Sequence, residues 1–107
     1  MQISYKKMIE NKQVTEELIL SCLSTCEKTI RENAYLEKQW KDYLYSGCYT
    51  AVRLEWSGYR NKLRAALQRK YEMKKIIAMS KSHTHQVAKR IVRKVVELID
   101  SGDYDLV

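Results

Sequence analysis

Residues 87–99 read VAKRIVRKVVELI, and this stretch decides the fold class because its apolar and charged residues alternate in pairs. Such pairs recur at helical spacing, even though many of the apolar residues are β-branched. The apolar face comprises Val87, Ile91, Val95 and Leu98, and the opposite, basic face comprises Lys89, Arg90, Arg93 and Lys94. Gly102 lies just downstream and is typical of a helix end. We therefore predict a helix over residues 84–101, with N-cap candidates at Ser82 and Thr84.

Two longer segments upstream also carry apolar residues at spacings of three and four, and they predict helices over residues 13–45 and 49–79. The first stripe comprises Leu18, Cys22, Cys26, Ile30, Leu36, Trp40 and Leu44, and the second Val52, Trp56, Tyr59, Leu63, Ala66, Met73 and Ile77. Ser46-Gly47 separates them, and so short a connection favours antiparallel packing. Gly58 lies inside the second pattern and indicates either a kink or a close helix contact.

Polar residues interrupt the first stripe at three positions, namely Thr25, Thr29 and Asn33. A buried Asn can fix the register between helices at a cost in stability. We interpret these positions instead as a partly exposed part of the seam between helices.

The composition supports one helical domain over residues 1–107. The chain has no Pro, three Gly and 45% apolar residues, which argues against both disorder and an all-β fold. We predict an all-α, elongated antiparallel helical hairpin with a third, C-terminal amphipathic helix. A chain of this size builds only a modest core, so we expect a homo-oligomer. We also expect a cytoplasmic protein, since the sequence shows neither a membrane span nor a secretory signal and has an odd number of cysteines.

Charge is segregated along the chain. Residues 1–46 carry seven bases and seven acids, residues 47–94 carry thirteen bases and two acids, and the last thirteen residues carry four acids and no base. A basic block with interspersed aromatic residues predicts a polyanionic partner. The predicted binding residues follow one flank of the second helix and the outer face of the third: Arg53, Arg60, Arg64, Tyr71, Lys75, Lys89, Arg90, Arg93 and Lys94.

These features predict a non-enzymatic protein that binds nucleic acid, or a nucleic-acid-handling complex, through the surface of residues 53–94. Arginine suits phosphate oxygens, and an aromatic ring among the arginines can stack on a base. The alternative is a small inhibitor or adaptor, of the kind that phages and other mobile elements encode, which docks on an acidic surface of a host protein. That alternative depends on size, helicity and charge.

The last helix also resembles the DNA-reading helix of sigma-like regulators. The resemblance is carried by the spacing of Val87, Arg90, Ile91, Arg93, Val95 and Leu98. It implies a helix-turn-helix in which residues 80–84 form the turn and the last helix enters the major groove. Lys81, Ser82 and His83 depart from the motif, because Gly and a sealing apolar residue are usual in that turn.

Other kinds of site find less support. Cys22-x-x-x-Cys26 and His83-x-His85 offer four zinc-type ligands, but the thiols lie on the apolar stripe and lack Cys-x-x-Cys spacing, so we expect no metal. The sequence shows no Gly-rich phosphate loop, no His-Glu-x-x-His and no nucleophile with a recognisable base, so we expect neither catalysis nor a cofactor.

Residues 67–77 share a short likeness with small helical mutases that bind anions with Arg and Lys. A small anionic ligand held across an oligomer interface therefore stays an alternative, with the candidate residues Arg60, Arg64, Lys70 and Lys74. The last helix also suits an anionic membrane surface. Because its apolar face has neither Trp nor Phe, we expect that face to pack on the hairpin instead.

Overall fold

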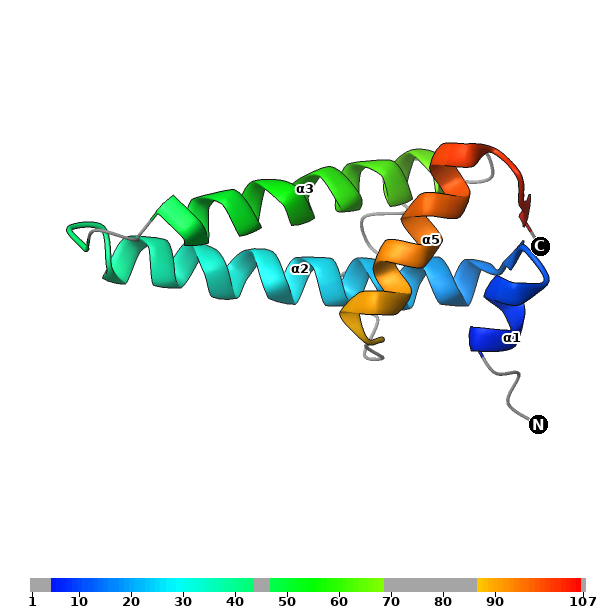
Figure 1. Ribbon diagram of the computed structural model, residues 1–107, viewed down its shortest axis with the longest axis horizontal. Helices are drawn as coiled ribbons and strands as arrows, with labels where there is room; N and C mark the ends of the chain where they lie inside the picture. Colours follow the sequence, from blue (N-terminus) through cyan, green and yellow to red (C-terminus); the bar gives the residue numbers. More distant parts are fainter. Residues whose placement is uncertain (1–4, 44–46, 69–86, 107) are drawn as a thin grey trace.

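Two long helices lie side by side and run in opposite directions, and together they form the frame of the protein (Figure 1). The structure is a computed structural model that describes residues 5–43, 47–68 and 87–106. Its helices are α1 (Tyr5–Glu10), α2 (Glu16–Gln39), α3 (Gly47–Gln68) and α5 (Lys89–Ser101), and two-residue strands occur at β1 (Gln13–Val14) and β2 (Asp105–Leu106). The predicted all-α class is confirmed. The molecule measures 46 × 29 × 27 Å, so it is elongated.

Local chemistry sets the bounds of α2. Thr15 is the N-cap, and its hydroxyl accepts a hydrogen bond from the Leu18 N–H at 3.1 Å. The first turn contains two acids, Glu16 and Glu17, whose negative charges interact favourably with the positive end of the helix dipole. The predicted start at residue 13 is wrong, because residues 13 and 14 are extended and pair with β2. The helix also ends earlier than predicted, at Gln39.

The last helix starts later than predicted and ends where predicted. Ala88 is its N-cap position, in an extended conformation with φ −62° and ψ 147°, so the helix begins at Lys89. The candidate caps Ser82 and Thr84 lie outside the described residues. Gly102 has φ 71°, a left-handed conformation that glycine adopts without strain, and its N–H bonds to the carbonyls of Leu98 and Ile99.

The core lies where α5 crosses the hairpin (Figure 1). Over residues 18–26, every side chain of α2 is buried. The prediction was a single buried apolar stripe, so more of this helix is buried than predicted. Its neighbours supply the remaining buried apolar side chains: Met8, Val14, Trp56, Leu63, Ala66, Leu67, Val92, Val95 and Val96. The core therefore occupies one half of the long axis, and the other half of the hairpin extends beyond it.

Polar residues inside α2 have partners of their own. Thr25 is buried, and its hydroxyl accepts from the Val87 N–H at 2.9 Å and lies 3.0 Å from the Val87 carbonyl oxygen. Thr29 donates to the Thr25 carbonyl at 2.8 Å, and Asn33 donates to the Thr29 carbonyl at 2.8 Å. The interpretation as a partly exposed seam holds for Asn33 but is wrong for the two threonines. Thr25 instead fixes the approach to α5 onto α2.

The segment after α5 returns to the turn between α1 and α2. β1 and β2 pair in parallel, with Gln13 opposite Asp105 and Val14 opposite Leu106. Lys12 joins this contact, since its carbonyl accepts from the Asp105 N–H at 2.9 Å and its ammonium pairs with Asp103. The acidic segment after α5 is therefore attached to residues 12–14, just before α2.

Candidate functional site

The three arginines predicted as a binding flank of α3 point toward α2. Arg53 donates to Glu37 through Nε at 2.6 Å and through a terminal nitrogen at 3.3 Å. Arg64 donates to Glu27 at 2.9 Å, and a terminal nitrogen of Arg60 lies 4.0 Å from the same carboxylate. These arginines therefore connect the two long helices.

The Glu27 cluster holds more positive than negative charge. Glu27 is the partner of both Arg60 and Arg64, and all three side chains are about a quarter exposed, at 29%, 25% and 24%. The Nε atoms of both arginines are buried and have no hydrogen-bond partner within the described part of the chain. This cluster lies inside the helix seam, so a phosphate would have to displace the carboxylate to reach both guanidinium groups.

The Glu37–Arg53 pair changes the ionisation of both groups. Hydrogen bonds from Arg53 and Thr50 lower the pKa of Glu37, and the nearby positive charge adds to this effect. The hydrogen bond to Glu37 raises the pKa of Arg53. The pair is therefore ionised in the folded protein, with each charge satisfied by the other.

Two cations of α5 lie over the ring of Trp56. Lys89 Nζ and the guanidinium carbon of Arg93 are each 5.6 Å from the ring centroid, within the range of cation–π attraction. Tyr59 packs edge-on against the same ring at 5.1 Å, and its hydroxyl donates to Glu55 at 2.6 Å, which raises the pKa of Tyr59. These contacts join α5 to α3.

Arg93 remains half exposed although it takes part in this cluster. A terminal nitrogen of Arg93 lies 3.6 Å from a Glu55 oxygen, and the Arg93 side chain is 51% exposed. Because that ion pair is long and open to solvent, it is weak. Arg93 can therefore still turn toward an external anion.

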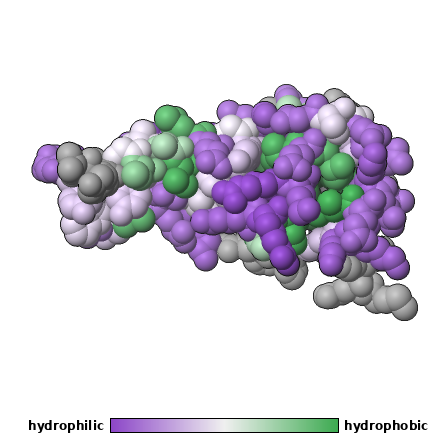
Figure 2. All heavy atoms as spheres, in the orientation of Figure 1, coloured by the Kyte–Doolittle hydropathy of each residue, from purple (hydrophilic) through white to green (hydrophobic). Residues whose placement is uncertain are grey.

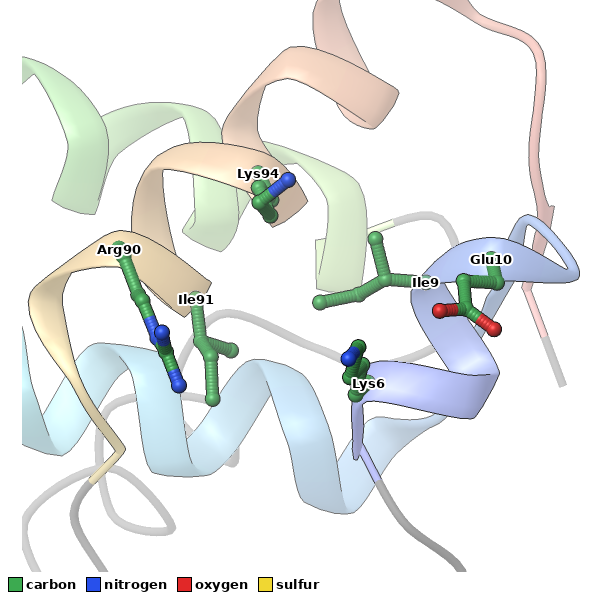
Figure 3. A pocket seen from close by; sticks show the side chains of 6 residues that line it. All are labelled: Lys6, Ile9, Glu10, Arg90, Ile91 and Lys94. Atoms are coloured by element: carbon green, nitrogen blue, oxygen red, sulfur yellow. The ribbon is translucent and has the colours of Figure 1, made fainter.

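A cleft of about 290 Å³ opens between α1 and α5 (Figure 3). Its described lining residues come from those two helices: Lys6, Ile9 and Glu10 from α1, and Arg90, Ile91 and Lys94 from α5. The two isoleucines supply an apolar floor, and three cations and one acid form the rim. Figure 2 shows the same side of the molecule, where hydrophobic patches lie between hydrophilic residues beside α5.

The cations of the cleft differ from those of α3. Among the residues that the structure describes, Lys6, Arg90 and Lys94 make no ion pair, and all three are exposed. The cleft borders the N-terminal half of α5, where no side chain caps the helix. The helix dipole adds positive potential at that end. This is the most available positive surface in the described ranges.

The structure thus divides the nine predicted binding residues. Arg90 and Lys94 lie together at the cleft, Lys89 and Arg93 lie beside them over Trp56, and Arg53, Arg60 and Arg64 belong to the helix seam. Tyr71 and Lys75 lie outside the described residues, as do Lys70, Lys74, both histidines and the predicted helix-turn-helix turn.

Lys6 is a site residue that the charge pattern of the sequence does not predict. It lies in the block of balanced charge, where counting bases against acids gives no signal. The spacing of Tyr5, Met8 and Ile9 indicates one turn of amphipathic helix and places Lys6 on the rim beside it. This helical spacing is the sequence signal from which the position of Lys6 could have been predicted.

The cysteines belong to the core or to the far end of the hairpin. Cys22 and Cys26 are fully buried free thiols, and burial raises both pKa values, that of Cys26 to about 12. Cys48 is exposed. Across the described ranges, no three His, Cys, Asp or Glu side chains gather as a metal site. None of the described helices combines the length and apolar content needed to cross a bilayer.

Comparisons of the chain with protein-family models, with curated proteins and with solved structures each gave no match.

Proposed function

We propose that the protein is a non-enzymatic binder of a polyanion, nucleic acid above all, and that it binds through the outer face of α5 and the adjoining part of α1. The observation that carries this proposal is the group of exposed cations without ion-pair partners in the described structure, Lys6, Arg90 and Lys94, around one cleft. Phosphate groups are the ligands that such cations bind through charge-assisted hydrogen bonds.

The neighbouring residues extend this surface along α5. Lys89 and Arg93 share the N-terminal half of the helix with Arg90 and Lys94, whereas Glu97 and Asp100 occupy its C-terminal half. A phosphate backbone therefore finds four cations over less than two turns of helix, plus Lys6 across the cleft. This arrangement suits several adjacent phosphates better than a single small anion.

The α3 arginines take a different role in this proposal. Arg53, Arg60 and Arg64 are bound to carboxylates of α2, so they position the hairpin that supports α5. The proposed contact surface is therefore smaller than the range of residues 53–94 that charge alone predicts. A reducing, cytoplasmic location is part of the proposal, and the free thiols Cys22 and Cys26, four residues apart on one buried helix, are consistent with it.

The test is the salt dependence of binding to fluorescently labelled single-stranded and double-stranded oligonucleotides, measured by anisotropy. Arg90→Ala, Lys94→Ala and Lys6→Ala should each weaken binding and reduce the slope of log K against log salt by about 0.7 to 0.9 per lost phosphate contact. Lys38→Ala is the matched control, because it removes one exposed positive charge from α2, away from the cleft. Equal losses from Lys38→Ala and Arg90→Ala would indicate nonspecific attraction and reject the site.

One observation favours a second candidate, an acidic partner protein. The cleft floor is made of Ile9 and Ile91, and an apolar floor offers a peptide side chain more than it offers a phosphate. On this alternative the protein is an inhibitor or adaptor that docks on an acidic surface. Ile9→Ala distinguishes the two candidates, since it should weaken the binding of an acidic protein partner and leave the affinity for oligonucleotides unchanged.

A further inference from the structure

The end of the hairpin that α5 does not cover is the most apolar exposed region among the described residues. Four large side chains there are about half exposed or more: Tyr35 at 65%, Leu54 at 57%, Tyr43 at 53% and Trp40 at 46%. We call these four residues the distal surface. Figure 1 shows no other described element beside this end of α2 and α3, and Figure 2 shows pale and green residues there.

Contacts within the hairpin order the region of the distal surface. Trp40 and Tyr43 pack edge-on, with ring centroids 5.9 Å apart. The Glu37–Arg53 ion pair ties α2 to α3 at the level of Leu54. Large, ordered aromatic side chains are the residues that most often dominate the energy of a protein interface.

Charge identifies the partner. Residues 31–54, which contain the distal surface, carry four bases and three acids, so only one of the seven net positive charges lies there. Two copies that meet through the α5 face would repel each other strongly, whereas two copies that meet through this nearly neutral end would not. The region also offers a polyanion little net charge.

A two-fold axis makes the same surface self-complementary, because each residue then faces its counterpart region in the other copy. Lys38 and Asp42 are exposed and flank Trp40 in the sequence, so a base of one copy can lie opposite an acid of the other. We propose that two copies of this chain associate through their distal surfaces with two-fold symmetry. The two cationic clefts then lie at opposite ends of the dimer, and the dimer does not depend on the proposed polyanion binding.

Sedimentation equilibrium over a range of concentrations tests the dimer. The wild-type chain should fit a monomer–dimer equilibrium, and Trp40→Ala should raise the dimer Kd by roughly thirtyfold. Leu54→Asp, which places like charges near the two-fold axis, should also raise the Kd. Arg90→Ala, at the cleft, is the control and should leave the Kd unchanged. In Trp40→Ala, Trp56 is the remaining tryptophan, and its buried emission reports that the variant is folded.

Cys48 gives an independent test of the location of the interface. It is exposed near the start of α3, whereas Cys22 and Cys26 are buried in the core. A short bismaleimide should therefore cross-link wild-type chains through Cys48 and fail to cross-link Trp40→Ala at the same concentration. A wild-type chain that is monomeric at every concentration overturns the proposal. A dimer that Trp40→Ala leaves intact, or that Cys48 does not cross-link, overturns it equally.

Discussion

The two halves of the hairpin are built from the same two helices and yet have opposite properties. In the half crossed by α5, the two helices bury most of their apolar side chains, and the adjoining α1 and α5 carry exposed cations that make no ion pair within the described residues. In the half beyond α5, charge is nearly balanced and aromatic side chains are exposed. The difference shows that a third helix decides which side chains of a helical pair become core and which become surface.

The strongest test of this comparison uses the two tryptophans, one in each half. Trp56→Ala should lower the free energy of unfolding by about 3–5 kcal/mol, because Trp56 is 1% exposed and its ring lies between α3 and the side chains of Lys89 and Arg93. Trp40→Ala should change the stability of the monomer by less than about 0.5 kcal/mol. Urea denaturation followed by circular dichroism, at a concentration below the dimer Kd, measures both. Equal losses would mean that the halves do not differ in packing.

A second test removes the hydroxyl that joins α2 to the approach to α5. Thr25→Val should cost about 1–3 kcal/mol, because the Val87 N–H loses its acceptor inside a part-buried contact. Thr29→Val is the matched control and should cost less, since in the described structure the Thr29 hydroxyl bonds to a carbonyl of its own helix. If both variants unfold at the same urea concentration, Thr25 does not fix α5.

The arginine seam provides a third test. Glu27→Gln should cost about 1–2 kcal/mol, because it leaves Arg60 and Arg64 without a negative partner in a seam that is only a quarter exposed. Asp103→Asn breaks a pair whose side chains are 56% and 68% exposed, and its effect should stay within about 0.5 kcal/mol. Thermal unfolding of the two variants in parallel checks the difference, and a larger loss from Asp103→Asn would contradict it.

Gly58 offers a smaller change, in the stabilising direction. A Cβ added there meets no atom within 4 Å, so neither the kink nor the close contact that the sequence suggested requires glycine. Gly58→Ala should raise the free energy of unfolding by about 0.5–1 kcal/mol, because alanine loses less backbone entropy in a helix. Gly102→Ala should do the reverse, since φ is 71° at that residue. A loss of stability in Gly58→Ala would reveal a contact that the described structure does not contain.

The smallest expected effect is the pH dependence of the Glu37–Arg53 pair. The pKa of Glu37 is lower in the folded protein than in the unfolded chain, so the pair adds stability above the unfolded pKa, and this stability is lost as pH falls through the folded pKa. Wild type should therefore exceed Glu37→Gln in stability at neutral pH, and the two should converge in acid. Urea denaturation at a series of pH values measures the difference in unfolding free energy between the two proteins. A difference that grows as pH falls would contradict the prediction.

Periodicity predicted much of the fold because each amphipathic stripe is a local property of the chain. The helical class and the Gly102 stop follow from neighbours within a few residues. The stripes were predicted only in part: α5 buries Val92, Val95 and Val96, whereas the predicted Val87, Ile91 and Leu98 are only partly buried. Trp40, a predicted member of the first stripe, is 46% exposed. The pairing of Gln13 with Asp105 has no local signal, since it joins residues 92 positions apart, and a two-residue strand has no period to detect. Helix starts depend on single caps, and the sequence offered several candidates.

The site was predicted less completely for a similar reason. Counting charges by block identified α5 correctly as basic, but it could not show that Glu27 and Glu37, in the balanced block, neutralise the arginines of α3. That pairing needs the register between two helices. Lys6 was missed because a base in a balanced block contributes nothing to a sum, although geometry brings it to α5.

The parallel pairing of β1 with β2 has a kinetic consequence. It closes a loop of about 90 residues, and loops of that length form slowly because the chain must lose much entropy before the contact gains anything. The helical crossing shortens the search once it has formed, so the tail should attach last during folding. By the same reasoning, it should be the first contact to open in hydrogen exchange, well before the amides of α2.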